Sequence, residues 1–399
     1  MRILLIYPSS EVERHSYTES LAKAFSELGH DVLYFSQSTR NPEKINRSIP
    51  ATSKRLKHLS GIYFKLLDYG KAFCRIYLEA FVKWWVLIDQ IHNLQKNLNE
   101  PDLLFFASLD ATLGHPLTRW YIDKKLNIPF TGILVCPEDT RRMTKSFFKI
   151  VRIDPYNILK SKRCISIGVV VEESVSFLSI LFNKPIIVLP DIVSVPVPIL
   201  DNSLGDLVRR RADGRFIIGI WGSLSQRKGI SEFLQMCLTL PSEKYFFVMG
   251  GKINREGLPE SEKEILQNAS SGVIDNVVAF DKWLTDNELF SGMLSCYLIF
   301  AAYPYWRFSS GIIGHAAVAG VPILVNDGFV MAKRIRDFNI GLVKRKEDPA
   351  ALWVTDNIAT VKKLSNSSLF KKGCSKYCES YGYEKWRKSL AHLIEPQDQ

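Results

Sequence analysis

The chain has 399 residues, which is long enough for two domains that each bury their own core. With 46% hydrophobic and 23% charged residues, it has the composition of a globular protein, which argues against extensive disorder. Lys and Arg outnumber Asp and Glu by 52 to 41, and the resulting net charge of +11 favours an anionic partner such as a nucleotide, a nucleic acid or a membrane surface.

Neither the N-terminus nor the cysteines indicate a secreted protein. The apolar run that opens the sequence, RILLIY, is too short for a signal peptide. The seven cysteines are scattered and form no CxxC pair, so reduced thiols and no structural zinc are expected. The longest other apolar run, 76–88, is interrupted by Glu79 and Lys83 and does not predict a membrane span. The sequence therefore predicts a cytoplasmic protein.

Residues 2–36 predict a βαβ unit and hence a parallel sheet. An apolar strand spans 2–7, an amphipathic helix 17–28 and a second strand 31–36. The first loop contains no glycine, so the GxGxxG dinucleotide fingerprint is absent. After an interruption the alternation resumes, with strands over 102–107, 130–135, 165–171 and 185–189 and helices over 117–126 and 172–181.

The interruption, residues 41–98, is basic and aromatic. Between Glu43 and Arg75 there are eight basic residues against two acidic ones, and aromatic residues are interleaved as far as Trp85. A basic, amphipathic helix of this kind can lie on an anionic membrane surface, here the inner face of the membrane. The alternative is a core helix of the first domain with a solvated basic face, and the sequence leaves both open.

A proline-rich stretch, PDIVSVPVPIL over 190–200, marks a domain boundary, because proline continues neither a helix nor a central strand. The expected domains are 1–198, 199–375 and a C-terminal helix, 376–399, that crosses back to the first domain. The second domain repeats the alternation, with strands over 215–221, 245–249, 277–280, 297–301, 321–325 and 338–343 and helices over 203–212, 230–239, 260–269, 286–295 and 312–319.

The predicted fold class is α/β, with two doubly wound Rossmann-like domains that face each other across a cleft. Ligands bind such sheets at the carboxyl ends of the strands. In the second domain three loops reach that edge: 222–229, 280–284 and 309–311.

These loops carry the chemistry of a diphosphate site. Lys228 is a point charge just before a helix, and the turn SSG at 309–311 precedes a helix whose first N–H groups and positive dipole end attract an anion. The alternative for this turn is an ordinary helix cap. A cation and a helix N-terminus can hold a diphosphate without a metal ion, and a flat pocket near Trp283 could take a base.

The order and spacing of these loops resemble the GT-B glycosyltransferases, and among them the GT4-like families that use nucleotide sugars. The resemblance is clearest over 216–343. The family's G-R-x-x-x-x-K-G loop is matched by GSLSQRKG at 222–229, and its F-x-G-x-[VL]-x-D-x-E-L stretch by FDKWLTDNEL at 280–289. The end of its E-x7-E signature, E-A-x-A-x-G-x-P-V, is matched by HAAVAGVPI at 315–323.

Three positions of the expected donor site depart from the family pattern. Ser223 stands where the family has an arginine, and Arg227 is the candidate to replace it; Arg307 and His315 stand where the family has two glutamates. The second glutamate normally holds the ribose hydroxyls, which a histidine can also bind. The SSG turn resembles that of a variant subgroup. The resemblance implies a donor site made of Gly222, Ser223, Arg227, Lys228, Trp283, Leu284, Arg307, Ser309, Ser310, Gly311 and His315.

The acceptor side offers candidates in loops after strands of the first domain. In an inverting reaction a carboxylate would deprotonate the acceptor hydroxyl, and Asp110, Glu138 or Asp139 could serve. The alternative for each is a helix cap or a loop salt bridge. No cluster of His, Cys and Asp has the spacing of metal ligands, so neither a metal nor another cofactor is expected.

The expected function is transfer of a hexose from a nucleotide-diphosphate sugar to a hydroxyl of a glycan or lipid-linked acceptor, in polysaccharide, glycan or glycolipid biosynthesis. Because the two glutamates are missing, a GT-B nucleotide-sugar epimerase and a binding protein without catalysis remain alternatives. Nucleic-acid binding is disfavoured, since the basic clusters accompany no recognition motif.

Overall fold

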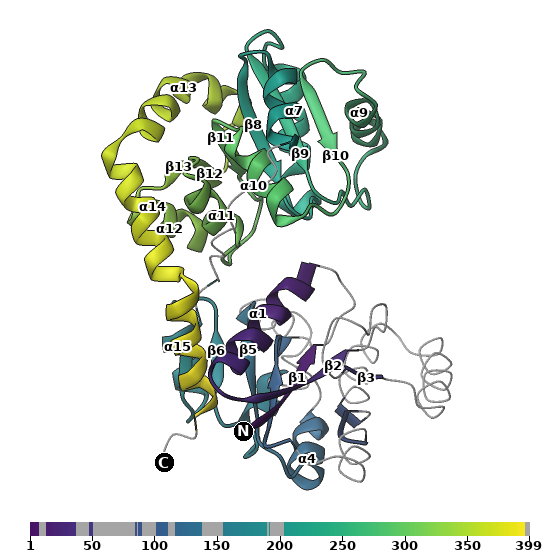
Figure 1. The fold of residues 1–399 in the computed structure, drawn as a ribbon, viewed down its shortest axis with the longest axis vertical. Coiled ribbons are helices and arrows are strands. Elements are labelled where there is room, and N and C mark those ends of the chain that lie inside the picture. Colours follow the sequence, from purple (N-terminus) through teal and green to yellow (C-terminus); the bar gives the residue numbers. More distant parts are fainter. Residues whose placement is uncertain are drawn as a thin grey trace. The chain divides into compact units, whose positions relative to one another are not determined.

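The computed structural model describes residues 1–7, 13–36, 48–50, 84–85, 87–89, 101–110, 116–137, 155–189, 191 and 203–395. The chain divides into two compact units. One contains residues 1–190 and 387–399, and the other contains residues 191–386. Figure 1 shows a sheet flanked by helices in each unit. The predicted domain limits at 198 and 375 stay a prediction.

The first unit is a seven-stranded parallel sheet with the strand order β3-β2-β1-β4-β5-β6-β7. Its strands are β1 (Arg2–Tyr7), β2 (Asp31–Ser36), β3 (Ser48–Pro50), β4 (Leu103–Phe106), β5 (Phe130–Leu134), β6 (Ile167–Val169) and β7 (Ile186–Val188). The helices between them are α1 (Glu13–Glu27), α4 (Pro116–Lys125) and α6 (Ser174–Leu181), with a 3-10 turn at Pro155–Lys160.

Apolar strand residues form the core of this unit, as the uninterrupted apolar runs predict. Trp84 is buried against Phe106 and Phe130, with ring centroids 5.0 and 5.3 Å away. The last helix, α15 (Tyr383–Ile394), packs here from Arg387 onward. Ser166, just before β6, donates a hydrogen bond to the carbonyl of Leu393. This bond attaches α15 to the sheet of the first unit.

The second unit is a six-stranded parallel sheet with the order β10-β9-β8-β11-β12-β13. Its strands are β8 (Phe216–Trp221), β9 (Tyr245–Gly250), β10 (Val277–Phe280), β11 (Leu298–Ala301), β12 (Ile323–Asn326) and β13 (Gly341–Lys344). Its helices are α7 (Ser203–Ala212), α8 (Ile230–Thr239), α9 (Glu260–Ser271), α10 (Asp286–Leu294), α11 (Ile312–Ala319), α12 (Val330–Phe338), α13 (Ala350–Asn366) and α14 (Ser368–Tyr381), with a 3-10 turn at Gln226–Lys228.

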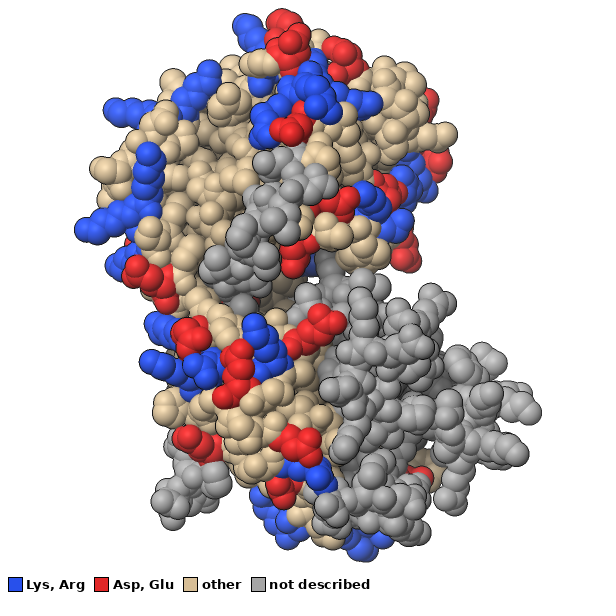
Figure 2. All heavy atoms as spheres, viewed as in Figure 1, with Lys and Arg blue, Asp and Glu red and all other residues tan. Residues whose placement is uncertain are grey.

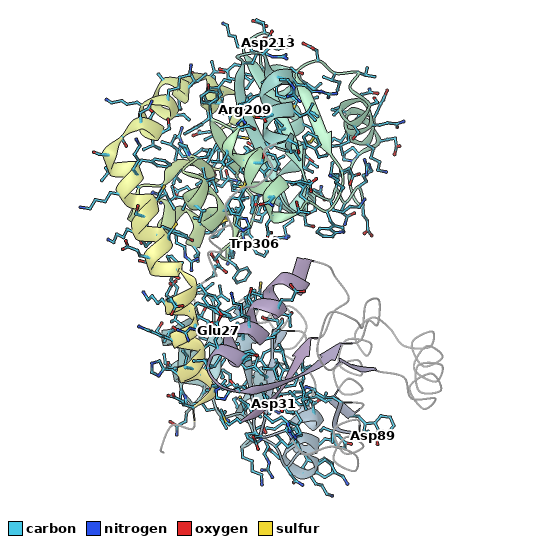
Figure 3. The ribbon with its side chains drawn as sticks, in the orientation of Figure 1. Glu27, Asp31, Asp89, Arg209, Asp213 and Trp306 are labelled. Atoms are coloured by element: carbon cyan, nitrogen blue, oxygen red, sulfur yellow. The ribbon has the colours of Figure 1, made fainter. Side chains whose placement is uncertain are left out.

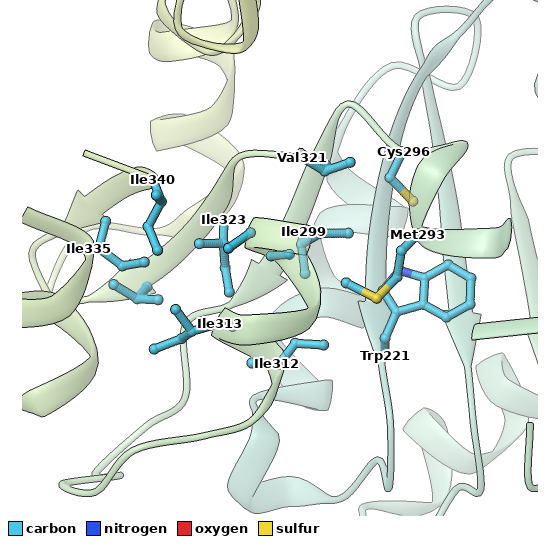
Figure 4. Packing of buried hydrophobic residues seen from close by; sticks show 14 of the residues in the cluster. Trp221, Met293, Cys296, Ile299, Ile312, Ile313, Val321, Ile323, Ile335 and Ile340 are labelled. Carbon is cyan, nitrogen blue, oxygen red and sulfur yellow. The ribbon is translucent and has the colours of Figure 1, made fainter. Parts of the chain in front are cut away.

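Trp221, the last residue of β8, lies in the core at the carboxyl edge of this sheet. Its indole is fully buried beside Met293 and Cys296 (Figure 4). A β-carbon added to Gly250 or Gly292 would stand 2.1 or 2.2 Å from the indole, so only glycine fits at either position. Trp221 is therefore locked in place directly before the loop that begins at Gly222.

The two doubly wound sheets confirm the predicted fold class, and most predicted elements agree with the structure to within a few residues. The prediction omits two elements, helix α12 in the second unit and strand β3 in the first unit. Residues 330–338 form helix α12, and the strand predicted from 338 begins only at Gly341. Strand β3 lies within the segment 41–98, where no strand was expected.

Most of the segment 41–98, including its basic cluster, lies outside the described residues, so its contact with a membrane stays a prediction. Within the described part of the chain, no helix combines the length and the apolar character needed to cross a membrane.

Candidate functional site

The loops after β8 and β9 pack tightly against each other at the carboxyl edge of the second sheet. The Gly222 N–H donates to the carbonyl of Gly250 at 2.9 Å, and the Leu224 N–H donates to that of Lys252 at 2.8 Å. Gly251 has φ 129°, and a β-carbon there would stand 1.9 Å from the Gly222 carbonyl oxygen. The backbone at Gly222 is therefore held in one position.

Lys228 lies above Gly222. Its Nζ atom is 2.9 Å from the position that a β-carbon on Gly222 would occupy, and 5.9 Å from the centre of the Tyr303 ring. The left-handed Gly229, with φ 77°, turns the chain from Lys228 into α8 and packs against the carbonyl of Ala302. The ammonium group is thus placed between the loops that follow β8 and β11.

The N-terminus of α11 comes from the loop after β11. No acceptor in the described part of the chain takes a hydrogen bond from the backbone N–H groups of Ser310, Gly311 or Ile312. These groups, with the helix dipole behind them, provide donors for an anion. The helix ends at Gly320 in the left-handed conformation, as predicted.

Ser309 differs from its neighbours in this turn because its hydroxyl is already engaged. It contacts the carboxylate of Asp191 and the guanidinium of Arg334, and Arg334 also lies 3.1 Å from Asp191. Arg334 is only 3% exposed and stacks on the ring of Tyr381 at 4.6 Å. The indole N–H of Trp306 donates to the Ser309 carbonyl at 3.0 Å. This Asp191–Ser309–Arg334 cluster fixes the conformation of the turn.

His315 lies one turn further along α11. Its ring meets Phe290 edge-on, with the centroids 5.4 Å apart. Burial lowers its pKa, the charge of Asp286 acts in the opposite direction, and the charge of Lys228 lowers the pKa further. His315 thus packs against α10 and lies within electrostatic range of Lys228. A neutral imidazole can both donate and accept a hydrogen bond, as a ribose diol requires.

We expect His315 to make the stability of the protein depend on pH. Because its folded-state pKa is lowered, the unfolded chain binds more protons between that pKa and about 6.5. Its contribution to the free energy of unfolding is fully present above that window and is lost as the pH falls through it. Urea unfolding from about pH 5 to about pH 8 should show a shallower dependence in His315→Gln. The exposed His392 offers the matched control, His392→Gln, and an unchanged slope in His315→Gln would contradict this assignment.

The loop after β10 is held by its own aspartate. Asp281 accepts hydrogen bonds from the Ile253 N–H at 3.0 Å and from Arg255, and Lys252 lies 3.2 Å away. Burial alone would raise the pKa of Asp281, but these hydrogen bonds together lower it. The next residues, Trp283 and Leu284, are 44% exposed and half-buried, respectively. Trp283 thus stands at the surface on the β10 side of the sheet.

Two predicted arginines contact aromatic rings. The Arg227 guanidinium lies 4.2 Å from the centre of the Trp306 ring, and that of Arg307 lies 5.4 Å from the Phe329 ring. Trp306 lies at the rim of its unit (Figure 3). Ser223 is half-buried in the loop after β8. The structure therefore brings Gly222 and Lys228 together, with His315 within electrostatic range of Lys228, and directs Arg227 and Arg307 towards rings.

In the first unit the structure describes one of the three catalytic candidates. Asp110 follows β4 and accepts hydrogen bonds from the N–H groups of Val135 and Cys136, at 2.6 and 3.0 Å, at the end of β5. Burial raises the pKa of Asp110, although these hydrogen bonds oppose the change. Its carboxylate thus joins the ends of β4 and β5, and its catalytic role stays a prediction. Glu138 and Asp139 lie outside the described residues.

Sequence reasoning missed Asp191, Arg334 and Tyr303, which shape the site from other segments. Only Tyr303 carried a local signal, as an aromatic residue just after a predicted strand. Among the residues that the structure describes, no group of three His, Cys, Asp or Glu side chains is arranged to hold a metal ion.

Comparisons with known proteins give structural likeness only. No protein-family model and no curated protein matches the sequence. Among solved structures, a sucrose-phosphate synthase from Thermosynechococcus elongatus is similar with a TM-score of 0.67 and 13% identity over 98% of each chain. HepE from Anabaena, in complex with UDP-glucose, is similar with a TM-score of 0.66 and 12% identity over 98% of each chain. An α,α-trehalose-phosphate synthase (UDP-forming) from Burkholderia vietnamiensis has a TM-score of 0.65 and 11% identity over 98% of this chain and 99% of that one.

These likenesses extend over nearly the full length of all the chains, and they agree with the two parallel sheets described above. The chain therefore has the GT-B fold.

Proposed function

We propose that this chain is a metal-independent glycosyltransferase that moves a hexose from a nucleotide-diphosphate sugar to a hydroxyl acceptor. The observation that carries the proposal is the position of Lys228. Its ammonium group lies over Gly222 and within electrostatic range of His315, and the N-terminus of α11 supplies backbone donors in the same unit. A point charge and a helix N-terminus are the two features that a leaving diphosphate needs.

The other residues along the carboxyl edge of the sheet contact different parts of the donor. Gly222 lets the diphosphate approach the backbone, and Ser310 and Gly311 donate N–H groups to it. Ser309 contributes through the position of its backbone, because Arg334 and Asp191 occupy its hydroxyl. His315 binds the ribose hydroxyls, and Trp283 with Leu284 contacts the base. A uridine nucleotide is the first choice, since HepE and the trehalose-phosphate synthase that share the fold use or bind UDP compounds.

Charge separation is the step at which these residues accelerate transfer. When the bond from the anomeric carbon to the diphosphate oxygen breaks, negative charge grows on the diphosphate. Lys228 and the helix N–H groups stabilise that charge more strongly in the transition state than in the bound donor. If the reaction is inverting, the acceptor oxygen forms its bond to the anomeric carbon while a carboxylate of the first unit accepts the proton of the acceptor hydroxyl. Asp110, Glu138 and Asp139 remain the candidates for that step.

One observation favours a second candidate function, binding of a nucleotide sugar without transfer, or its epimerisation. Arg307 and His315 occupy the positions of the two carboxylates in the similar family, and Arg307 lies against Phe329.

The acceptors proposed for transfer are a glycan or a lipid-linked saccharide. Figure 2 shows Lys and Arg interspersed with Asp and Glu on the visible described surface, which gives no support to a nucleic-acid partner on that face.

Calorimetric titration with UDP, GDP and ADP, followed by their glucose conjugates, tests the donor site. We expect one nucleoside diphosphate to bind at least about tenfold more tightly than the others, because a base pocket that fits one base leaves polar groups unpaired with another. Release of that nucleotide from its sugar conjugate in the presence of acceptors then separates transfer from binding alone. Absence of binding to all three nucleotides would refute the proposal.

A further inference from the structure

The segment 303–307, YPYWR, collects cation–aromatic pairs to an unusual degree. Lys346 lies 3.5 Å above the ring of Tyr305, and Arg227 lies 4.2 Å from that of Trp306. Arg307 itself lies 5.4 Å from the ring of Phe329. These six residues, Arg227, Tyr305, Trp306, Arg307, Phe329 and Lys346, form what we call the cation–aromatic surface. They come from the loops after β8, β11, β12 and β13.

Two cations of this surface, Arg227 and Lys346, are held by rings rather than by carboxylates. Within the described residues, no carboxylate forms an ion pair with Arg227 or Lys346. Two carboxylates on the neighbouring loops are taken by other arginines: Asp327 pairs with Arg336 at 2.7 Å, and Asp348 pairs with Arg345 at 3.0 Å. An aromatic ring holds a cation by its face and leaves the N–H donors directed outward. Arg227 and Lys346 are thus positioned without being neutralised.

Tyr305 is the second, independent observation. It has φ 62°, in the left-handed region that a bulky residue rarely occupies, and it is 75% exposed. Burial of the side chain does not explain this conformation. Strained residues of this kind cluster at ligand sites, and the face of the Tyr305 ring opposite Lys346 is the one that a sugar would contact.

The strand order gives this surface a definite place relative to the donor site. Trp283 lies on the β10 side of β8, whereas Phe329 and Lys346 follow β12 and β13 on the opposite side. Lys228 contacts Tyr303 at the near end of the same segment. If the diphosphate lies at Lys228 with the base towards Trp283, the saccharide end points towards the cation–aromatic surface.

We propose that the cation–aromatic surface binds a saccharide that carries a carboxylate or phosphate group. Tyr305 and Trp306 contact the sugar ring, and Arg227, Arg307 and Lys346 surround the anionic group. This inference rests on the proposed function and specifies its substrate class. The anionic group belongs either to the transferred sugar of the donor or to the acceptor, and the two sources present the same chemistry to these side chains.

Two binding series distinguish these sources. The first compares UDP-glucuronic acid with UDP-glucose, and the second compares glucose 6-phosphate with glucose in the presence of saturating UDP. If UDP is not the nucleotide selected by the panel above, the corresponding conjugates replace it. We expect the anionic ligand to bind at least about fivefold more tightly in one series, as one partly exposed charge-assisted contact provides. Equal affinities in both series would overturn the inference.

Variants assign the preference to this surface. Lys346→Gln should reduce it at least about threefold and leave the affinity for UDP itself unchanged, since a partly exposed ion pair is modest. Lys362→Gln is the matched control. Lys362 also lies over an aromatic ring, 5.7 Å from the centre of Phe216, but at the amino end of β8. A preference that survives Lys346→Gln, or that Lys362→Gln removes equally, would contradict the assignment.

Tyr305→Gly separates binding from folding. Glycine adopts the left-handed conformation without strain, so we expect a Tm equal to or above that of the wild type together with weaker saccharide binding. A variant that binds the anionic saccharide as tightly as the wild type would refute the role of Tyr305. Absence of wild-type binding to UDP, GDP and ADP would instead refute the donor site, so the two failures are distinguishable.

Discussion

Replacing Lys228 with alanine is expected to weaken nucleoside diphosphate binding roughly 10- to 150-fold, which corresponds to about 1.5–3 kcal/mol for a hydrogen bond to a charged group. The reason is local. Lys228 is the cation that the structure places above Gly222, where a diphosphate would approach the backbone. Calorimetric titration of the nucleotide selected by the panel measures the loss.

The design of this experiment follows from the shape of the side chain. Lys228→Arg keeps the charge but replaces a compact ammonium with a planar guanidinium, so partial recovery of affinity is expected. Lys263→Ala is the control, because Lys263 lies on α9 and pairs with Glu260 at 3.0 Å. If Lys228→Ala binds the nucleotide as tightly as the control variant does, the diphosphate site lies elsewhere.

The elements around Lys228 could be predicted from sequence because local rules determine them. The apolar runs of β8 and β11 are buried on both faces, as a parallel sheet requires. Gly320 stops α11, and Thr285 with Glu288 forms a complete capping box at the start of α10. Each of these signals lies within a few residues of the feature that it predicts.

Helix α12 shows a local signal that was present and was missed. Met331 and Ile335 are buried four residues apart on one face, and Asn339 ends the helix in the left-handed conformation with φ 56°. The apolar residues 340–343 directly after it favoured an earlier and longer strand. The helix had to be recognised from its cap, because its central residues are mostly charged.

The functions of the polar side chains could not be predicted in the same way, because they depend on distant segments. Asp110 was considered as a base, but only the pairing of β4 with β5 brings its carboxylate to the Val135 and Cys136 N–H groups. Ser309 was assigned to the donor on the basis of its turn. Its actual partners, Asp191 and Arg334, are 118 and 25 residues away in the sequence. No spacing rule connects such positions.

Asp191→Ala is expected to lower the free energy of unfolding by about 3 kcal/mol, because it leaves a buried guanidinium without its carboxylate. Arg334 is 3% exposed, whereas Asp191 is 24% exposed, so the larger cost comes from removing the carboxylate and not the cation. Urea unfolding of the full-length chain measures the change. Asp206→Ala is the matched control, since Asp206 pairs with Arg209 on the surface and should cost less than about 1 kcal/mol.

The double variant Asp191→Ala/Arg334→Met distinguishes charge from packing. Methionine removes the uncompensated charge and keeps much of the contact with Tyr381, so the double variant should be more stable than Asp191→Ala alone. A double variant whose loss equals the sum of the two single losses would show that the two charges do not interact. Because the same cluster holds Ser309, both single variants should also weaken nucleotide binding under conditions in which they remain folded. The stability of this buried ion pair and the geometry of the donor turn are thus expected to change together.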